Sequence, residues 1–522
     1  MVTRGKMLEA IAQHDSKKWD VVIIGGGATG LGCAVDAASR GYKTLLLEKY
    51  DFAKGTSSKA TKLVHGGVRY LKQGHYKLVT EALRERGYLF KNAPHLVKNL
   101  TFDIPVYSNF QKLVYYIGLS LYDLLAGNES FGTSRMLSKK NIVQDIPAIK
   151  TKKLKGGISY QDGQFDDARL AVELMLTASE HGGTLLNYAE VTGFIKDEKG
   201  KITGLRFYDS LYKKETQITG KSFINATGVF VDNILQLDEP GKKHTVVASQ
   251  GSHIVVDKKF LPGKQALMIP KTSDGRVLFA IPWHDRCLIG TTDHPVENIS
   301  VDPRPLENEI EFILSTAAQY MDPAPGKADI LSVFSGLRPL AAPVGDQKST
   351  KEISRSHKIT VAPSGLVSIT GGKWTTYRKM SEDCVNMAAR TGRLIHSDCK
   401  TRTLSLHGFA WQRDPYDPLF IYGADSNKIH VLQNQYPELK AQIHPALPYT
   451  FAEIAWAVEH EMAITLEDVL ARRTRSILLN AQATIEAAPA VATIMAEKMQ
   501  KDQVWIDEQV VSFKQFAQGY IW

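Results

Sequence analysis

The chain has 522 residues, of which 43% are hydrophobic and 23% charged, with a formal net charge of +9. This length favours two to four domains with a large core, and the composition excludes a disordered or fibrous chain. The four cysteines lack the spacing of a disulfide framework or a zinc site, so we expect a reducing compartment and no metal. The sequence shows no apolar run of the kind found in a signal peptide or a membrane span, which predicts synthesis in the cytoplasm.

The positive charge favours anionic partners. Lys and Arg are spread along the chain and accompany no nucleic-acid-binding module, so we expect no nucleic acid partner. An anionic substrate or an anionic membrane surface fits the charge equally well.

Residues 20–48 predict a strand, a tight turn, a helix and a second strand. Gly25, Gly27 and Gly30 have G-x-G-x-x-G spacing at the start of the helix, and Glu48 ends the second strand. In such a motif the first glycine allows the turn, the second admits a pyrophosphate and the third lets the helix approach the sheet. Free N–H groups at the helix start favour the diphosphate charge, and the carboxylate accepts hydrogen bonds from a ribose. We therefore predict a site for FAD or NAD, rather than a glycine-rich turn without a ligand.

Residues 51–71, DFAKGTSSKATKLVHGGVRYL, are rich in glycine, small hydroxyl side chains and cations. We expect this segment to be neither helix nor strand. Its composition suits a segment laid along a cofactor, where backbone N–H and hydroxyl groups meet phosphates. A solvated surface loop is the alternative.

The sequence TSSKATKLVHGGVRYL, following GGGATG and LLLEK, resembles the FAD-dependent glycerol-3-phosphate dehydrogenase family, a member of the larger D-amino-acid-oxidase-like flavoprotein group. Further matching blocks follow in the order of that family: DDARL (166–170), NATG (225–228), GSHIVV (251–256), IGTTD (289–293), SGLRPL (335–340) and GGKWTTYRKM (371–380). VEHEMAITLEDVLARRTR (458–475) resembles the helical cap of the family, so the resemblance covers nearly everything after the first 18 residues.

This resemblance implies an α/β plus α+β fold, with a Rossmann-like FAD-binding domain, an antiparallel-sheet substrate domain and an all-α cap domain. We expect residues 19–404 to hold the first two domains interleaved, with the substrate sheet mainly from 72–150 and 245–345, and 405–522 to form the cap. Residues 1–18 precede the matched region and are compatible with a short surface helix or a disordered tail.

Beyond residue 71, apolar periodicity predicts helices, in chain order, at 72–100, at 110–126, within 156–188 ahead of a strand, at 305–321, from near Thr375, after a capping box at 450–453, at 465–475 and at 483–500. Strands are predicted as an antiparallel meander at 191–209, a buried strand at 221–228, several antiparallel strands at 246–293, a strand at 330–340 and a hairpin at 358–370. The family resemblance implies that the strand at 221–228 returns to the parallel sheet.

The segment Phe110–Ala126 is apolar and aromatic at helical spacing, but it is too short to span a bilayer and contains Asp123. A core helix and an amphipathic helix lying on a membrane surface both fit this pattern.

For the site, the resemblance implies substrate contacts from Arg69, Tyr70, His253, Arg338, Arg355, Lys373 and Thr375. We choose His253 as the base for the substrate hydroxyl, because imidazole has a suitable pKa and cationic neighbours would keep it neutral. Lys373 or Arg338 could share this catalytic role by stabilising an alkoxide. Taken alone, Arg338 is typical of an exposed ion pair and His253 of a structural histidine.

The predicted cofactor-binding residues are Gly25, Gly27, Ala28, Thr29, Gly30, Glu48, Thr56, Ser57, Ser58, Thr61, Lys62, Leu63, His65, Gly66, Gly67, Val191, Ala226, Thr227, Gly228, Gly336, Arg338, Gly371, Gly372, Lys373 and Thr375.

The implied activity is oxidation of sn-glycerol 3-phosphate to dihydroxyacetone phosphate by hydride transfer to noncovalent FAD, with electrons passed to a membrane quinone. It further implies a homodimer attached peripherally, through an anionic membrane surface, to the inner face of the cytoplasmic membrane. An oxidase that uses oxygen, an amine or amino-acid oxidase, and a flavin-binding scaffold without turnover are the alternatives. The sequence shows no insertion ahead of the cap of the kind that oxidase relatives carry, which favours the dehydrogenase.

Overall fold

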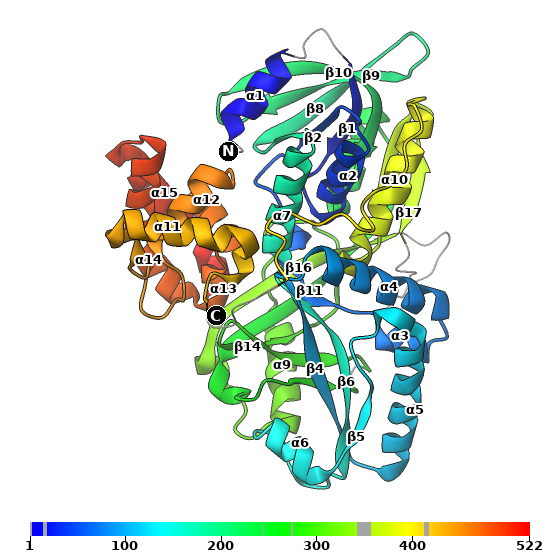
Figure 1. Cartoon of the computed structure of the whole chain (residues 1–522), viewed down its shortest axis with the longest axis vertical. Coiled ribbons are helices and arrows are strands. Elements are labelled where there is room, and N and C mark those ends of the chain that lie inside the picture. The colour runs from blue at the N-terminus through cyan, green and yellow to red at the C-terminus, as the bar shows by residue number, and fades with distance from the viewer. Residues whose placement is uncertain (1–2, 14–17, 243, 273–274, 342–356, 412–416) are drawn as a thin grey trace.

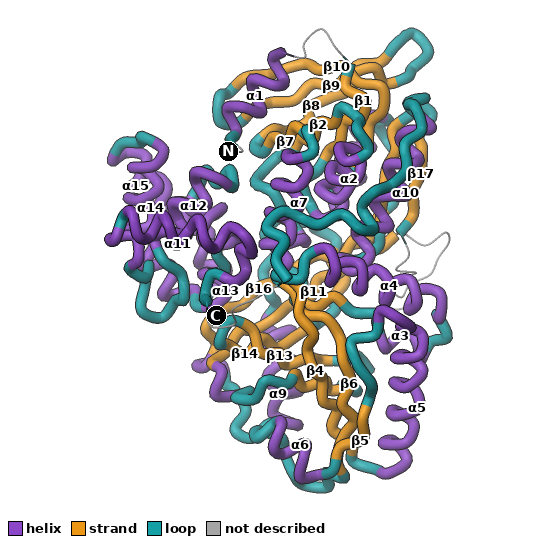
Figure 2. Tube along the Cα trace, in the orientation of Figure 1, coloured by secondary structure: helices purple, strands orange, loops and turns teal. Residues whose placement is uncertain are grey.

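The computed structural model describes residues 3–13, 18–242, 244–272, 275–341, 357–411 and 417–522. Two sheets lie one above the other in Figure 1, and the C-terminal helices pack at one side of the region where the sheets meet. Figure 2 shows strands concentrated in these two layers and helices around them. The mixed α/β architecture with a helical C-terminal part confirms the predicted fold class.

The first sheet has the order β17-β18-β10-β1-β2-β7, and its β18-β10-β1-β2-β7 part is parallel. Its strands are β1 (Trp19–Ile24), β2 (Thr44–Leu47), β7 (Thr184–Leu186), β10 (Lys214–Asn225), β17 (Lys358–Val361) and β18 (Leu366–Thr370). Helices α2 (Ala28–Ser39), α7 (Asp167–Glu180), α8 (Val231–Asp238) and α10 (Tyr377–Thr391) accompany it. Because helices cover the parallel strands, these strands are almost wholly apolar and buried, as in β1 and β2.

Two further strands, β8 (Ala189–Lys196) and β9 (Ile202–Asp209), pair antiparallel with each other, and β9 pairs with the first half of β10. The second half of β10 pairs parallel with β1. The predicted meander and the predicted return to the parallel sheet are therefore both confirmed. The hairpin of β17 and β18 is confirmed as well.

The second sheet is mostly antiparallel and has the order β15-β11-β14-β13-β12-β4-β6-β3, with β16 paired to β11 and β5 to β6. Its strands are β3 (Leu63–Val64), β4 (Val97–Val106), β5 (Arg135–Leu137), β6 (Gly156–Phe165), β11 (Val246–Asp257), β12 (Ala266–Ile269), β13 (Leu278–Trp283), β14 (Arg286–Gly290), β15 (His294–Val296) and β16 (Ile330–Ala341). The helices that belong to this half are α3 (Val68–Lys72), α4 (Tyr76–Asn92), α5 (Asn109–Ala126), α6 (Lys139–Asp145) and α9 (Glu307–Tyr320).

Two predictions of secondary structure were wrong, and one strand was not predicted. The helix expected at 72–100 ends at Asn92, because Pro94 disfavours helical backbone in Ala93, and β4 then begins at Val97. Strand β6 was not predicted from the sequence. The segment 51–71 is not free of regular structure, since it contains β3 and α3, and Gly67 starts α3 with a φ of 83°.

The C-terminal helices are α11 (Ser426–Gln435), α12 (Phe451–His460), α13 (Ser476–Leu479), α14 (Ala481–Met499) and α15 (Gln503–Ala517). The capping box of Thr450 and Glu453 is present at the start of α12, as predicted. The helix expected at 465–475 is a π-helix over Asp468–Arg473. No helix in the described ranges has the length and hydropathy needed to cross a membrane.

Residues 4–13 form helix α1 (Arg4–Gln13), which is the first of the two alternatives considered for the N-terminus. Its Met7 and Ile11 side chains are buried against the first sheet core. The Arg4 Nη2 atom lies 2.8 Å from Asp209 Oδ2. The helix is therefore fixed to the fold by packing and by a buried ion pair.

Asp103 on β4 has no exposed surface, and this burial raises the pKa of its carboxyl group to about 7, offset only in part by the Ser159 hydroxyl. Between the ordinary Asp pKa and 7 the folded chain keeps a proton that the unfolded chain releases. The free energy of unfolding therefore falls as pH rises through this window, and the loss is complete above pH 7.

We predict that Asp103→Asn removes this part of the pH dependence, because the amide carries no charge at any pH. The shift corresponds to at most about 4 kcal/mol of stability lost by the wild type between pH 4 and 8. Thermal unfolding midpoints of both proteins across that range test the prediction. Parallel curves for the two proteins would show that Asp103 is not the group responsible.

Candidate active site

A cavity of about 1090 Å³ lies where the two sheets face each other. Its walls come from the carboxyl ends of β1, β2, β10 and β18 and from β11, β12, β13 and β16 of the second sheet. Ligands of open α/β sheets bind in the crevice beyond the carboxyl ends of the strands. The position and size of the cavity thus suit a large cofactor together with a small substrate.

The glycine motif forms the floor of this cavity. Gly25 has a φ of 105°, and a Cβ atom there would lie 2.9 Å from the carbonyl oxygen of Ala226. A Cβ atom on Gly30 would lie 1.8 Å from the carbonyl oxygen of Gly25. Gly27 is the N-cap of α2 and lies on the cavity wall. Helix α2 therefore presents its N-terminus and bare backbone to the cavity, an arrangement that fits the diphosphate of a dinucleotide.

Glu48 follows β2 and lines the same cavity. Its carboxylate accepts hydrogen bonds from the backbone N–H groups of Gly26, at 2.5 Å, and Tyr50, at 2.8 Å. Burial raises the pKa of this carboxyl group. In this structure Glu48 holds the glycine turn against the end of the second strand.

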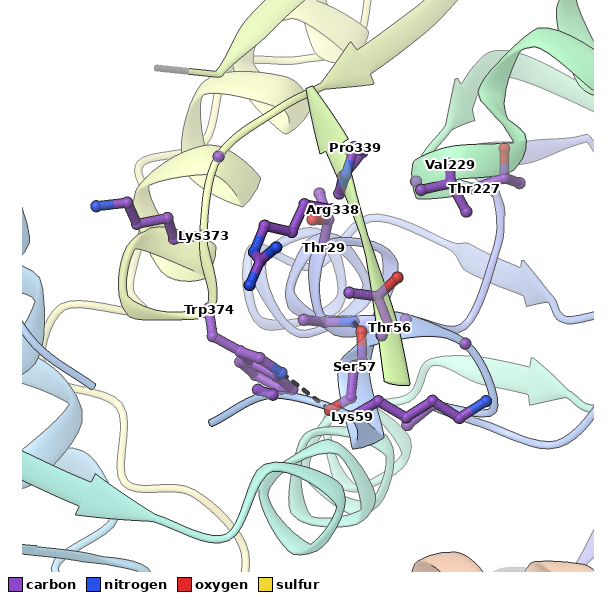
Figure 3. A pocket seen from close by; sticks show the side chains of 18 of the residues that line it. Thr29, Thr56, Ser57, Lys59, Thr227, Val229, Arg338, Pro339, Lys373 and Trp374 are labelled. Carbon is purple, nitrogen blue, oxygen red and sulfur yellow. Dashed lines mark hydrogen bonds between the residues drawn. The ribbon is translucent and has the colours of Figure 1, made fainter. Parts of the chain in front are cut away.

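The segment around Ser57 joins the two sheets across the cavity. The Ser57 hydroxyl accepts a hydrogen bond from the Ala28 N–H at 2.8 Å, while the Thr56 hydroxyl donates to the Leu337 carbonyl at 2.6 Å. On a third side the Trp374 indole N–H donates to the Ser57 carbonyl at 2.9 Å, as Figure 3 shows. The segment is thus held by the glycine helix, by β16 and by the turn before α10.

His253 on β11 is fully buried, and its ring position is closely determined. Its Nε2 atom lies 3.0 Å from the Thr61 hydroxyl, and its ring stacks on Phe334 with 4.7 Å between the ring centroids. A Cβ atom on Gly290 would lie 2.2 Å from the ring, so the glycine leaves the room that the imidazole needs. Burial, and then the charges of Lys62 and Arg338, hold the histidine pKa well below its ordinary value. The imidazole is therefore neutral at physiological pH.

Arg338 on β16 is anchored by several oxygen atoms. Its Nη2 atom donates to the Thr291 hydroxyl and the Thr292 carbonyl, both at 3.0 Å. Its Nη1 atom donates to the carboxylate of Asp293 at 3.2 Å. A Cβ atom on Gly251 would lie 2.2 Å from the guanidinium. Asp293 therefore already compensates part of the positive charge that Arg338 brings to the cavity.

Lys373 and Tyr70 lie together at another part of the wall. The Lys373 Nζ atom is 3.9 Å from the centroid of the Tyr70 ring. In Figure 3 the Lys373 side chain points away from the Arg338 guanidinium, which extends toward the middle of the view. The Thr375 hydroxyl accepts a hydrogen bond from the His65 N–H at 3.2 Å. The wall around Lys373 is therefore tied to the 61–67 segment.

Of the predicted site residues whose side chains the structure describes, all line the cavity except Gly30, Ser58, Lys62 and Gly66. Gly30 lies behind the cavity wall, where its lack of a side chain lets α2 approach Gly25. Lys62 is fully buried away from the cavity and pairs with Asp167. The Arg69 side chain and the whole of Arg355 lie outside the described parts of the chain.

Many residues of the wall were not predicted from the sequence, and Lys59, Thr291 and Trp374 are three of them. Lys59 was passed over inside a segment already assigned to the cofactor, and its Nζ atom donates to Asp302 at 2.9 Å. Thr291 and Trp374 belong to blocks that carried the family resemblance, so their position in those blocks was the available signal. Their partners are too distant in sequence for a local pattern to reveal them.

Comparisons with known proteins agree with this geometry. Residues 20–378 match the family of FAD-dependent oxidoreductases, and residues 399–505 match the C-terminal domain of alpha-glycerophosphate oxidase. The mitochondrial glycerol-3-phosphate dehydrogenase of Macaca fascicularis is 38% identical over 97% of this chain and 74% of the relative. The probable mitochondrial glycerol-3-phosphate dehydrogenase of Dictyostelium discoideum is 37% identical over 99% of this chain and 86% of the relative.

Among solved structures, the glycerol-3-phosphate dehydrogenase of Bacillus halodurans complexed with FAD has a TM-score of 0.80. It is 28% identical, and the match covers 100% of this chain and 99% of that one. The L-alpha-glycerophosphate oxidase of Mycoplasma pneumoniae has a TM-score of 0.57 at 18% identity, over 74% of this chain and 98% of that one, which is a likeness of fold alone.

The two-sheet fold and the glycine floor define an FAD-dependent oxidoreductase, with FAD as its cofactor. The similarity extends along nearly the entire chain and includes the C-terminal helices. The chain belongs to the FAD-dependent glycerol-3-phosphate dehydrogenase family.

We predict that Gly30→Ala weakens FAD binding at least about tenfold, or 1.4 kcal/mol. The new methyl group would overlap the Gly25 carbonyl and push α2 away from the strand that precedes it. Fluorescence titration of the apoprotein with FAD measures the effect.

Gly118→Ala in α5 is the matched control, because a Cβ atom there meets nothing within 4 Å. This variant should keep the wild-type affinity for FAD. If Gly30→Ala also keeps it, the close approach of α2 to β1 does not set the cofactor site.

Proposed function

We propose that this chain oxidises sn-glycerol 3-phosphate to dihydroxyacetone phosphate and passes the electrons to a membrane quinone. The observation that carries the proposal is a neutral histidine, His253, in one cavity with Arg338, Lys373 and the glycine floor. When bound, FAD supplies the redox chemistry by accepting the hydride equivalent from C2 of the substrate.

His253 takes the role of base. A neutral imidazole has a nitrogen lone pair that accepts the proton of the substrate hydroxyl, and Thr61 and Phe334 hold the ring in place for this transfer. Arg338 or Lys373 shares this role by stabilising the negative charge that develops on the hydroxyl oxygen. Arg338 also disfavours a protonated histidine, after burial and the charge of Lys62, so it helps to keep the base neutral.

The substrate phosphate is assigned to the cationic wall. Arg338 has the planar donor geometry that suits phosphate oxygens, and Lys373 adds a point charge beside Tyr70. Thr375 adds a hydroxyl group near by. Arg69 and Arg355 complete this set in the family resemblance. The remaining predicted residues that line the cavity are assigned to FAD.

Quinone is the proposed electron acceptor, in line with the relatives named as dehydrogenases. An oxidase is the second candidate, because the C-terminal residues match the C-terminal domain of alpha-glycerophosphate oxidase. The two candidates share the substrate and differ in what reoxidises the reduced protein. Homodimer formation stays a prediction.

We predict that anaerobic addition of glycerol 3-phosphate bleaches the oxidised flavin absorbance of the purified holoprotein, whereas glycerol and amino acids do not. A soluble quinone analogue should then restore the absorbance much faster than air-saturated buffer does, with little hydrogen peroxide formed.

Rapid recovery in air with one peroxide per substrate would establish the oxidase instead. Holoprotein that stays oxidised with glycerol 3-phosphate would contradict the proposed substrate and favour a flavin-binding scaffold. Bleaching by an amino acid would point to the amine or amino-acid oxidase alternative.

For the membrane surface we propose helix α5, which lies at the outer edge of the second sheet in Figure 1. One face of α5 packs on the core through Leu119 and Tyr122. The opposite face is apolar and exposed, through Phe110, Leu113, Val114, Ile117, Leu121 and Leu124. Burial of such a face in the interface of a bilayer removes apolar surface from water.

Exposed cationic side chains lie in the same half of the molecule as this apolar face, which supports an anionic membrane as its partner. Exposed Arg135 is on β5, which packs against α5, and Lys139 and Lys140 follow at the start of α6. Lys152 and Lys153 are also exposed in the loop before β6. Basic residues beside an apolar helix face add attraction to anionic lipid headgroups. Attachment at the inner face of the cytoplasmic membrane stays a proposal that rests on the family resemblance.

We predict that the double variant Phe110→Ser, Leu124→Ser binds vesicles of phosphatidylglycerol and phosphatidylcholine at least about tenfold more weakly than wild type, because each large apolar side chain contributes about 1.5–3 kcal/mol when fully buried. Cosedimentation measures the binding.

Val504→Ser, Val511→Ser on α15 is the matched control, since both valines are exposed and lie among the C-terminal helices. Weaker binding by this control and unchanged binding by the α5 variant would move the membrane surface to the C-terminal helices.

A further inference from the structure

Arg475 lies two residues after the end of the π-helix Asp468–Arg473. Its side chain reaches from the C-terminal helices to the cofactor segment, residues 51–71. Its side chain is buried, with 2% exposed. The Nη2 atom donates to the Ser58 carbonyl at 2.6 Å and to Asp167 Oδ1 at 3.0 Å, while Nη1 donates to the Ala471 carbonyl at 2.7 Å. Arg475 thus links the π-helix, through Ala471, to a segment more than 400 residues earlier in the chain.

Asp167 continues this link. Its carboxylate has no exposed surface and accepts a hydrogen bond from the Ala60 N–H at 2.8 Å. It also pairs with Lys62 Nζ at 2.7 Å, and Lys62 in turn donates to the Ser58 carbonyl at 2.9 Å. The turn Ser58–Lys62 is therefore held at three points. Arg475 and Lys62 bind the Ser58 carbonyl, and Asp167 binds the Ala60 N–H and the Lys62 ammonium group.

The opposite side of this turn faces the cofactor cavity. Thr56, Ser57, Lys59, Ala60 and Thr61 line the cavity, whereas Ser58 and Lys62 do not. Thr61 is the residue whose hydroxyl meets His253 Nε2. Only the backbone of the Ser58–Lys62 turn thus lies between Arg475 and the cavity.

The charges behind the segment are balanced. Two cations, Lys62 and Arg475, face two anions, Asp166 and Asp167, with Arg475 Nε at 3.7 Å from Asp166. His284 Nε2 lies 3.6 Å from the same Asp166 carboxylate. Removal of Arg475 leaves two buried carboxylates facing one buried lysine, and this imbalance of charge is unfavourable. The segment therefore depends on a guanidinium supplied by the C-terminal helices.

We propose that Arg475 is a positioning residue for the active site: it holds the Ser58–Lys62 turn so that the turn presents its cavity face to FAD and Thr61 to His253. The part concerning His253 rests on the proposed function, whereas the part concerning FAD does not. The C-terminal part of the chain thereby helps to set the geometry of the cofactor site.

A matched pair of buried arginines separates this role from simple packing. Arg169 is equally buried and joins α7 to the C-terminal helices through Glu461 at 2.8 Å, besides pairing within α7 with Glu173 at 3.1 Å. Its side chain does not contact the cofactor segment in the described structure. We compare Arg475→Met with Arg169→Met, and Arg475→Lys with Arg169→Lys, in the full-length chain. FAD affinity of the apoprotein and its thermal midpoint are measured for each variant.

The expected result is at least about a tenfold loss of FAD affinity in Arg475→Met, a smaller loss in Arg475→Lys, and a change within about threefold in both Arg169 variants at a comparable loss of thermal midpoint. Lysine restores part of the effect because it keeps a charge beside Asp167 but lacks the second nitrogen that donates to the Ala471 carbonyl. Equal losses of affinity in the Arg475 and Arg169 variants overturn the proposal. If the methionine variants do not fold, the lysine pair decides by the same criterion.

A pH profile of anaerobic flavin reduction gives a second readout. The charges that lower the His253 pKa are those of Lys62 and Arg338, and Thr61 and Phe334 are the uncharged groups on its ring. Burial lowers the His253 pKa more than these charges do. Lys62 is charged at acidic pH in both proteins, since its pKa is about 8. A turn released from Arg475 admits water to the ring, so the acidic limb of the profile should move upward in pH, toward the ordinary histidine value.

An unchanged limb in Arg475→Met contradicts the His253 part of the proposal. Wild-type protein that glycerol 3-phosphate does not reduce instead refutes the proposed function, and the FAD affinities then still test the positioning role on their own.

Discussion

The contact between Gly30 and the carbonyl oxygen of Gly25 sets how closely α2 meets the end of β1, and the cavity is built outward from that distance. With α2 in this place, the N–H of Ala28 reaches Ser57. Thr56, the next residue back, reaches β16 of the second sheet. The two sheets are thus joined through three short contacts, which are Gly30 with Gly25, Ala28 with Ser57, and Thr56 with Leu337. We expect a methyl group on Gly30 to displace all three.

Close packing around the cavity also determines the charge states of its side chains. Burial and two nearby cations keep His253 neutral, and the charge of Arg338 is partly met by Asp293 rather than left entirely for a ligand. A cavity that was only cationic would attract any small anion. Pairing one of the cations with an internal carboxylate ties its guanidinium to a fixed direction, which favours recognition by geometry over recognition by charge alone.

The sequence was sufficient for elements whose pattern is local, such as the glycine turn between β1 and α2 and the capping box at Thr450. The return of β10 to the sheet followed from the family resemblance and not from a local pattern. It failed for β6, where glycine and polar residues interrupt the apolar pattern and pairing with β4 determines the strand. The end of α4 had a local signal, Pro94, that was not used. Contacts such as Trp374 with Ser57 and Arg475 with Ser58 join residues hundreds of positions apart, and no local periodicity encodes them.

These long-range contacts have a consequence for how the protein is made. Residues near 25 form the floor of the cavity, residues near 375 close its wall, and Arg475 supports it from behind. During vectorial synthesis on the ribosome, the glycine turn emerges long before its remaining partners exist. The complete set of contacts around the Ser58 turn therefore exists only after Arg475 has been synthesised.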